Sequence, residues 1–452
     1  MTCLLINRVP LIDKINKNRL LNLIKFSSKS IAFELKNETT HYKINEKEYI
    51  KDEYSNINNN ILQKIEKRLH NQHEHPIKLI KDRIQANLLG YQHFNDYTPI
   101  VKTTRNFDDL LVKKDHPGRS KSDSFYFNKD YMLRTHTTTN EIDVYKLKEV
   151  DKFTICADVY RRDEVDKNHY PIFHQLEVVH LFNKEQLEKY KRESDNQQEN
   201  NEKINNSIEV EESKLNLNNL SSSNGLQKEH NIKDIELVTK DLKTTVNQML
   251  FNLFGKNQNQ KLKIRWIEAY FPFTSPSWEV EIYFNNQWLE VMGCGILKQE
   301  ILDRNERKNE IGWASGFGIE RLSMVLYNIQ DIRLFWSEDS RFLNQFKNKS
   351  LNDSIQFQPF SKLPPCIKDI TFWINNQFEE NDFSDLVREI AGDLVESVEL
   401  IDSFKHPKTN RESKCYRIIY RSMDRNVTNE EINSIQEKIR SVIEDKLNVE
   451  LR

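Results

Sequence analysis

The segment from Asp158 to Glu177 most constrains the fold, because it places a charged stretch between two apolar runs. The runs, Phe153–Val159 and Leu176–Phe182, are typical of strands, which makes the charged stretch their connecting loop. A tight hairpin needs only two to five turn residues, whereas this connection is longer and contains no glycine. Gln175 and Glu177 fall at the returning strand, where buried polar groups need partners that a bound ligand can supply. We therefore interpret the hairpin as a binding site; the alternative is a solvated loop.

The whole chain limits the classes of protein to consider. Its 452 residues predict two or more structural units. The net charge of −2 gives no overall basic field, so a nucleic-acid partner must be held by local patches. Five scattered cysteines argue against a zinc finger or a disulfide framework and favour a reducing compartment. No apolar run approaches the roughly 20 residues that span a bilayer, so we expect no membrane segment.

Residues 1–30 differ from the rest of the chain. Basic residues are frequent there and Asp13 is the single acid, with leucine and isoleucine interleaved and serine at 27, 28 and 30. This composition resembles a mitochondrial transit peptide. The alternative is an ordinary basic extension.

The next part of the chain predicts a sheet with helices around it. Helices are expected from His75-Pro76, with Ile77, Ile80, Ile84 and Leu88 on one face, and over Ile235–Leu253. Strands are expected in Leu262–Phe273, Glu279–Phe284 and Trp288–Met292, the second of which alternates apolar and polar residues. Residues 194–225 are rich in Asn, Gln, Ser and Glu, which predicts a disordered insertion inside one domain.

Residues 358–452 predict a separate domain. A strand around Ile370–Ile374 precedes a helical stripe from Phe383 to Val398, and strands are expected at Val398–Phe404 and Tyr416–Tyr420. Thr428 and Glu431 form a capping box that opens a second helix, and Leu447–Leu451 is the candidate closing strand. The order βαββαβ is that of a ferredoxin-like split sandwich.

Half of the chain's ten glycines lie between Gly293 and Gly318, just before Arg321. Glycines allow close approach of the backbone to a ligand, and a helix that begins here places Arg321 in its first turn, which already favours anions. A guanidinium there can bind phosphate oxygens through two N–H groups. Together with Arg161 it is predicted to grip a polyphosphate from two sides. The alternative is a helix-capping glycine beside a surface arginine.

With these motifs in place, the chain resembles the class II aminoacyl-tRNA synthetases, and within them the phenylalanyl-tRNA synthetase family in its single-chain mitochondrial form. The resemblance covers residues 70–452 apart from the insertion, and it rests on six motifs in the family's order: Met132–His136, Asp158–Glu177, Phe271–Ser277, Trp288–Gly295, Gly312–Arg321 and Asp331–Leu343. It implies an α+β fold: a class II antiparallel sheet with flanking helices over residues 31–357, followed by a ferredoxin-fold anticodon-binding domain over 358–452.

The resemblance also implies roles for individual residues. Arg161 is expected at the α-phosphate of ATP and Arg321 at the γ-phosphate, as the two catalytic groups, with His169 closing over the nucleotide and Phe173 stacking on adenine. Glu290 is a candidate ligand of Mg²⁺. The amino acid is expected to contact His136, Thr138, Thr139, Asn140, Glu141, Gln175, Glu177, Phe271, Phe273 and Ala314.

Two positions depart from the family pattern. Glu141 stands where the family has glutamine, which either strengthens the hold on an ammonium group or impedes the substrate's carboxylate. Ser315 stands where a bulky aromatic residue commonly precedes Gly316, which is expected to loosen the packing beside the ring pocket.

The implied function is ATP-dependent attachment of phenylalanine to tRNA-Phe through phenylalanyl-adenylate, by a monomer in the mitochondrial matrix. In the C-terminal domain, Arg417 and Arg421 are predicted to share a strand face that contacts tRNA; the alternative is a solvated face. Two other readings stay open. One is a catalytically inactive paralogue that binds tRNA or senses amino acids, and the other is a subunit of a two-chain enzyme.

Overall fold

The computed structural model describes residues 40–44, 46–65, 67–194, 207–212, 224–255, 261–284, 286–351, 353–359 and 364–452. The chain divides into two compact units, Met1–Glu53 and Tyr54–Arg452. In the first unit, strands β1 (His41–Ile44) and β2 (Lys47–Ile50) pair in antiparallel fashion. The predicted transit peptide, residues 1–30, lies outside the described residues.

An eight-stranded sheet forms the centre of the second unit, in the order β3-β6-β7-β12-β11-β10-β9-β8. All neighbours in it are antiparallel except the two edge pairs, β3–β6 and β8–β9. The predicted strand pair is confirmed, and the sheet is mixed and mainly antiparallel, as expected. The strands are β3 (Gln92–Phe94), β6 (Lys152–Tyr160), β7 (Ile172–Asn183), β8 (Ile208–Glu212), β9 (Leu262–Ala269), β10 (Thr274–Phe284), β11 (Gln287–Leu297) and β12 (Glu310–Gly318).

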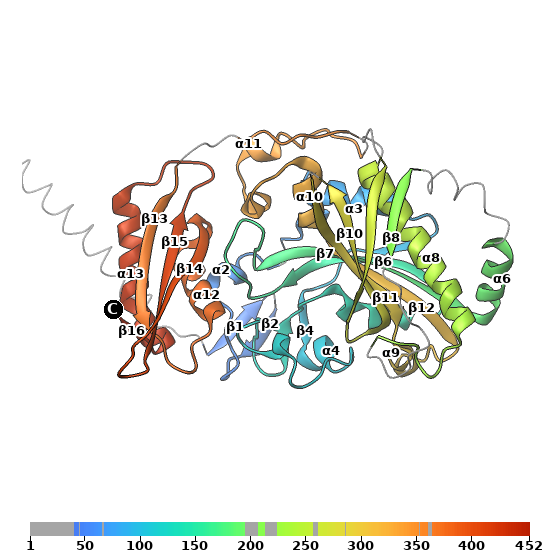
Figure 1. Ribbon diagram of the computed structural model, residues 1–452, viewed down its shortest axis with the longest axis horizontal. Helices are drawn as coiled ribbons and strands as arrows, with labels where there is room; N and C mark the ends of the chain where they lie inside the picture. The colour runs from blue at the N-terminus through green and yellow to red at the C-terminus, as the bar shows by residue number, and fades with distance from the viewer. Residues whose placement is uncertain are drawn as a thin grey trace, which may run out of the picture. The chain divides into compact units, whose positions relative to one another are not determined.

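Three helices pack on this sheet or on one another beside it (Figure 1). Helix α3 (Pro76–Gln85) begins as predicted, because Pro76 occupies its first turn and His75 Nδ1 accepts a hydrogen bond from the Ile77 amide. Helix α8 (Ile232–Leu250) contacts β11 and β12, and α10 (Ile319–Tyr327) contacts β7 and α3. The apolar face predicted for α3 is buried, although Leu88 lies beyond the end of the helix.

The remaining elements of this large domain are short. They are α2 (Asn59–Leu62), η1 (Leu69–Asn71), β4 (Ile100–Lys102), α4 (Thr103–Phe107), η2 (Pro117–Arg119), β5 (Tyr131–Leu133), η3 (Thr137–Asn140), α5 (Glu141–Tyr145), α6 (Lys184–Ser194), η4 (Phe251–Gly255), α9 (Gln299–Arg304), η5 (Ile332–Trp336) and α11 (Ser340–Leu343). No helix in the described part of the chain is long and apolar enough to cross a membrane.

The prediction of disorder throughout residues 194–225 is wrong at β8. Ile208–Glu212 pairs in parallel with Leu262–Trp266 at the sheet edge, and Ile208 is buried. Asn224 is buried too, and its side chain bonds the backbone of Ser277 on β10. Local composition predicted no core, but a neighbouring strand supplies the backbone partners that five mostly polar residues need.

The C-terminal domain has the predicted βαββαβ order: β13 (Cys366–Trp373), α12 (Glu380–Ala391), β14 (Val395–Lys405), β15 (Glu412–Tyr420), α13 (Asn429–Leu447) and β16 (Glu450–Leu451). The sheet order is β14-β15-β13-β16, and α12 and α13 lie along the sheet in Figure 1. Ile370, Phe372 and Ile418 are buried in the core between these layers. Thr428 caps α13 as predicted, since its side chain accepts a hydrogen bond from the Glu431 amide.

One boundary in this domain differs from the prediction. The apolar stripe ran on to Val398, but α12 ends at Ala391 and a short η6 turn (Gly392–Leu394) leads into β14. Gly392 has φ of 59°, a conformation that glycine adopts readily and that stops a helix. Val395 and Val398 therefore face the core from a strand.

Candidate active site

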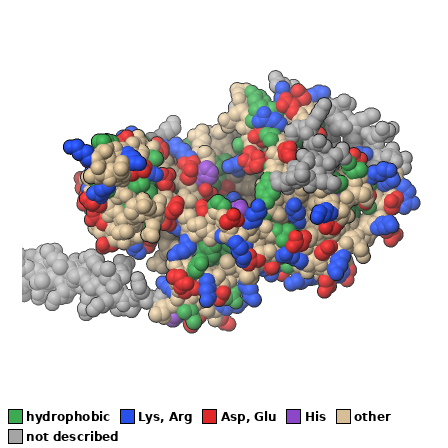
Figure 2. Space-filling view, turned by 60° about the horizontal axis from the view of Figure 1, so that its bottom comes forward, with side chains coloured by type: hydrophobic (Ala, Val, Ile, Leu, Met, Phe, Trp, Pro, Cys, Tyr) green, Lys and Arg blue, Asp and Glu red, His purple; other side chains and the backbone are tan. Residues whose placement is uncertain are grey.

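A cleft of about 630 Å³ lies against the sheet, lined by β7, β11, β12 and the loop that joins β6 to β7. We call residues 161–171 of that loop the hairpin loop. Acidic, basic and histidine side chains gather around a hollow of the surface in Figure 2. Most of the predicted site residues line this one cleft, including Arg161, His169, Phe173, Glu177 and Arg321.

Arg161 and Phe173 lie at the two ends of the hairpin loop and touch each other. The Arg161 guanidinium carbon lies 5.2 Å from the centre of the Phe173 ring, within cation–π range. Its Nε donates to the Thr135 carbonyl at 2.9 Å. These two contacts hold the guanidinium plane and leave its terminal nitrogens for an anion.

His169 is held within the hairpin loop by Asp166. The Asp166 carboxylate accepts hydrogen bonds from the His169 amide, at 2.7 Å, and from its ring Nδ1, at 2.9 Å. The hydrogen bond to Asp166 raises the pKa of His169, because a carboxylate favours the charged imidazolium. A ring whose charged form is favoured suits a ligand that carries phosphate.

Arg321 lies in the first turn of α10 and forms an ion pair with Glu290 of β11, with 3.7 Å between Nη1 and Oε2. About half of each of these side chains is exposed, so the pair is weak and exchangeable. Glu281 is directly opposite Glu290 on β10. Burial is the largest cause that raises the pKa of the nearby Glu279, and the negative charges of Glu290 and Glu281 raise it further. Glu281 is itself paired with Arg265, and of these three carboxylates Glu290 is the one that lines the cleft, so Glu290 is the one that could meet Mg²⁺.

Polar groups converge at the other end of the cleft. The Thr138 hydroxyl donates to Glu177 Oε1, and the Thr137 amide donates to Gln175 Oε1 at 3.2 Å. Glu177 is 6% exposed. The buried segment 137–140 is thereby fixed to β7, and the carboxylate of Glu177 is aimed at the cleft.

Glu141 brings a second carboxyl group to the same place. It is 1% exposed, and its Oε2 accepts a hydrogen bond from the Tyr145 hydroxyl at 2.6 Å. Its carboxyl group neighbours that of Glu177, and each acts on the pKa of the other. Burial raises the pKa of Glu141 well above its ordinary value, and the neighbouring carboxylate of Glu177 adds to this shift. Burial raises the pKa of Glu177 too.

Aromatic rings wall the space beside these carboxyl groups. The rings of Phe271 and Phe273 are nearly parallel, with centres 6.2 Å apart, and the His136 ring lies 5.7 Å from Phe273. Burial lowers the pKa of His136 to about 3, so its ring is neutral. A Cβ atom on Gly293 would lie 2.6 Å from Phe271, so only glycine leaves room for that ring.

Ala314 lies on β12 and belongs to the apolar cluster against which Phe273 packs. Ser315, the departure from the family pattern, is buried, and its hydroxyl has no hydrogen-bond partner. Both line the cleft. Small side chains on this strand leave the room that flat rings need.

Two of the residues predicted to contact the amino acid, Thr139 and Asn140, are not among the residues that line the cleft. The Thr139 hydroxyl donates to Asn106 at 3.0 Å, and Asn140 accepts from Arg134 at 2.9 Å. Within the η3 turn neighbouring side chains point in different directions. Thr139 and Asn140 therefore stabilise the fold, whereas Thr138 lines the cleft.

The prediction that Arg417 and Arg421 share a strand face is wrong. Arg417 is on β15, exposed, and paired with Asp369 at 2.9 Å. Arg421 follows the end of β15, and its Nε lies 2.8 Å from the buried Glu396. The two arginines therefore do not share a strand face.

Sequence reasoning missed two supporting residues, Tyr145 and Asp166. Tyr145 lies four residues after Glu141, the spacing that puts side chains on one helix face, and this was the available signal. Asp166 lies three residues before His169 in a loop without periodicity, so its pairing had no signal in the sequence.

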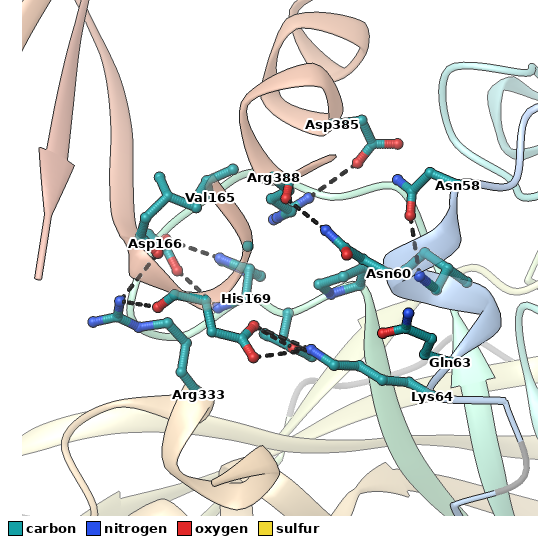
Figure 3. A pocket seen from close by; sticks show the side chains of 16 residues that line it. Asn58, Asn60, Gln63, Lys64, Val165, Asp166, His169, Arg333, Asp385 and Arg388 are labelled. Carbon is teal, nitrogen blue, oxygen red and sulfur yellow. Dashed lines mark hydrogen bonds and ion pairs between the residues drawn. The ribbon is translucent and has the colours of Figure 1, made fainter. Parts of the chain in front are cut away.

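The C-terminal domain contacts the hairpin loop directly (Figure 3). Arg388 of α12 donates to the Asp163 carbonyl at 2.6 Å, and Asn60 donates to the Arg388 carbonyl at 3.0 Å. Lys64 pairs with Asp393 at 3.0 Å. A small cavity of about 180 Å³ remains between these groups and His169. The loop that carries His169 is thus supported from two sides.

Comparisons with known proteins agree with this geometry. The family described as tRNA synthetases class II core domain (F) matches residues 57–194 and 225–346, and the ferredoxin-fold anticodon binding domain matches 361–452. The chain is similar to the mitochondrial phenylalanine–tRNA ligase of Mus musculus, with 41% identity over 90% of this chain and 88% of the relative. The corresponding protein of Dictyostelium discoideum is 42% identical over 88% of this chain and 90% of the relative.

A relative that is named as a subunit matches less of the sequence. The phenylalanine–tRNA ligase alpha subunit of Nostoc punctiforme is 33% identical over 60% of this chain and 66% of its own length. The single-chain relatives thus account for both domains. On this similarity, the chain belongs to the phenylalanine–tRNA ligase family, with a class II core domain followed by a ferredoxin-fold anticodon-binding domain.

Proposed function

We propose that this protein attaches phenylalanine to tRNA-Phe in two steps, through phenylalanyl-adenylate. The observation that carries the proposal is the division of one cleft. Arg161 and Arg321 border one part, and buried carboxyl groups beside two parallel phenyl rings border the other. Such a cleft matches a nucleoside triphosphate on one side and an aromatic amino acid on the other.

In the first step, the carboxylate of phenylalanine attacks the α-phosphorus of ATP, and pyrophosphate leaves. No protein nucleophile is needed, so catalysis rests on positioning and charge stabilisation. Arg161 is oriented by Thr135 and Phe173, and we assign it to the α-phosphate. Arg321 exchanges Glu290 for the γ-phosphate, and His169 closes over the nucleotide.

Glu290, which lines the cleft, is the carboxylate that would hold Mg²⁺ together with the phosphate oxygens of ATP. When bound, Mg²⁺ supplies positive charge to the phosphate oxygens of ATP. Arg321 forms an ion pair with Glu290, with 3.7 Å between Nη1 and Oε2. The same carboxylate therefore holds the arginine in place before the nucleotide binds.

At the amino-acid end, Phe271 and Phe273 clasp the substrate ring edge-to-face, which suits their quadrupoles. Ala314 lies at the para position. Thr138, Gln175, Glu177 and Glu141 receive the ammonium group, and His136 borders the same space as a neutral ring. The buried polar atoms without partners at this end, among them Glu177 Oε2, gain a donor when the substrate binds.

In the second step, the 2′-hydroxyl of the terminal adenosine of tRNA-Phe attacks the acyl carbon of the adenylate, forms the ester with loss of its proton, and AMP leaves. The C-terminal domain binds the anticodon region, with Arg417 as one contact. We expect a monomer located in the mitochondrial matrix, in keeping with the names of its single-chain relatives.

Charging of tRNA tests the proposal. Purified protein with ATP, Mg²⁺ and labelled L-phenylalanine should form an alkali-labile ester on tRNA-Phe and not on a tRNA for another amino acid. A protein that binds tRNA-Phe without forming the ester would instead be the inactive paralogue.

A further inference from the structure

The ammonium end of the cleft contains two buried carboxyl groups with too few donors. Glu141 Oε2 has Tyr145 and Glu177 Oε1 has Thr138 as donors. The other two oxygens, Glu141 Oε1 and Glu177 Oε2, are buried and have no hydrogen-bond partner. Both residues line the cleft, so these oxygens are what a ligand at this end meets.

The two carboxyl groups are neighbours in this cleft: Thr138, which donates to Glu177, lies three residues before Glu141, and each carboxyl group acts on the pKa of the other. Two ionised carboxylates cannot form a hydrogen bond, because both only accept. Like charges at this separation in a buried site repel strongly, so such a pair retains one proton.

No cation in the described surroundings removes that repulsion. Arg307 acts on Tyr145 and is itself paired with Glu310 at 2.9 Å, and Arg161 lies toward His136. Strand β6 presents Ile155 opposite Glu177, and β12 presents Gly316. Tyr145, whose pKa burial raises, contacts the pair directly, and His136, whose pKa burial lowers to about 3, lines the same cleft. Both are neutral near pH 7.

We propose that Glu141 and Glu177 share one proton when the amino-acid site is empty, and that the substrate's ammonium group displaces this proton to solvent. The inference rests on the proposed function, because it assigns the ammonium of phenylalanine to this pair. Before binding, the pair with its proton carries one negative charge. Afterwards the two carboxylates flank the ammonium, whose N–H groups serve both oxygens that lacked donors.

Proton exchange at this pair also makes Glu141 a residue that selects for substrate charge. A glutamine at this position offers an amide that needs no proton, so a single carboxylate would face the ammonium. With two carboxylates, an uncharged amine must compete with a proton for the same oxygens. Only the cationic form of the substrate brings a positive charge that offsets the loss of that proton.

Calorimetry of L-phenylalanine binding tests this inference. Titrations at one pH in two buffers with different ionisation enthalpies count the protons released. The intact protein should release close to one proton below the pKa of the pair, and its Kd should fall by up to about tenfold per pH unit as the pH rises there. Glu141→Gln should bind L-phenylalanine with little proton release and a nearly flat Kd. Equal proton release by both proteins, or none by the intact protein, would overturn the inference.

Two substrate analogues keep the test independent of the variant. L-phenylalaninol has the ammonium group without the carboxylate and should release the proton from the intact protein. 3-Phenylpropionate lacks the ammonium and should release none. Phenylalaninol binding without release would also overturn the inference. A different failure marks the proposed function: if L-phenylalanine does not bind and supports no ATP–pyrophosphate exchange, the assignment of the substrate is wrong, whatever the pair does with its proton.

Discussion

The two ends of the cleft differ in whether their polar side chains have protein partners before a substrate binds. At the phosphate end, the cations already have protein partners: Arg321 has Glu290, His169 has Asp166, and Arg161 has the Thr135 carbonyl. At the amino-acid end, several buried polar atoms have no partner, including His136 Nδ1, Glu141 Oε1 and Glu177 Oε2.

The difference follows from exposure. Arg321 and Glu290 are each about half exposed, so water and a weak ion pair keep the cation in place at little cost. Glu141 and Glu177 are 1% and 6% exposed, so water does not satisfy their oxygens, and each oxygen left unsatisfied would cost about 1–3 kcal/mol. Selectivity belongs at the second end, because a ligand that displaces the shared proton must supply donors of its own to both carboxylates.

The largest effect is expected at the phosphate end. Arg161→Ala removes a planar cation that needs no reorganisation, and ATP–pyrophosphate exchange should fall by about 10²–10³-fold in kcat. The Kd of L-phenylalanine should change less than the exchange rate, because the contacts of Arg161 are with Thr135 and Phe173 and not with the carboxyl groups or phenyl rings assigned to the amino acid. Lys167→Ala is the matched control: it removes an exposed cation from the same loop, paired at 3.3 Å with Glu396, and exchange should stay within about threefold. Similar losses in both variants would refute the specific role of Arg161.

At the amino-acid end, Gly293→Ala should raise the KM for phenylalanine by about 10- to 100-fold. The new Cβ would lie 2.6 Å from Phe271 Cζ, so the ring must move into the space of the substrate, at a cost of about 1–3 kcal/mol. Gly318→Ala is the control, since a Cβ there meets nothing within 4 Å. Steady-state exchange kinetics that show the same KM for both variants would contradict the assignment of the ring pocket.

A smaller change at the same end should widen the pocket. Ala314→Gly removes a methyl group from the apolar cluster against which Phe273 packs, and the exchange rate with p-chlorophenylalanine relative to phenylalanine should rise by about tenfold. An unchanged ratio would mean that Ala314 does not lie at the para position.

The carboxyl pair should also be visible in folding. The raised pKa values of Glu141 and Glu177 mean that the folded protein holds a proton that the unfolded chain releases above the ordinary carboxyl pKa of about 4.3. This contribution is present at low pH and is lost as pH rises through the raised pKa, by at most about 1.4 kcal/mol per pH unit. Urea unfolding at several pH values should show this loss in the intact protein and less of it in Glu141→Gln. Equal slopes would contradict the shared proton.

The smallest effect concerns the C-terminal domain. Arg417→Ala should weaken tRNA-Phe binding by a few fold and reduce the slope of log affinity against log salt by about 0.7–1. Asp369→Ala should not weaken it, because it frees Arg417 from its ion pair at 2.9 Å. An unchanged salt slope in Arg417→Ala would favour the solvated face.

The sequence predicted those parts of the molecule that repeat a pattern. Apolar runs marked β6 and β7, alternating residues marked β10, and the capping signals marked α3 and α13. Elements stabilised by distant partners gave no local signal: Ile208–Glu212 becomes a strand through β9, and Arg421 turns to Glu396. Within the site, spacing did not separate Thr138 from Thr139, because the direction of each side chain depends on the η3 turn.

Amino-acid-dependent ATP–pyrophosphate exchange across all twenty amino acids tests the central claim most directly, because it requires both ends of the cleft at once. We predict rapid exchange with L-phenylalanine, exchange with tyrosine lower by about a hundredfold, and background rates with the rest. Exchange supported best by another amino acid, or by none, would contradict the account.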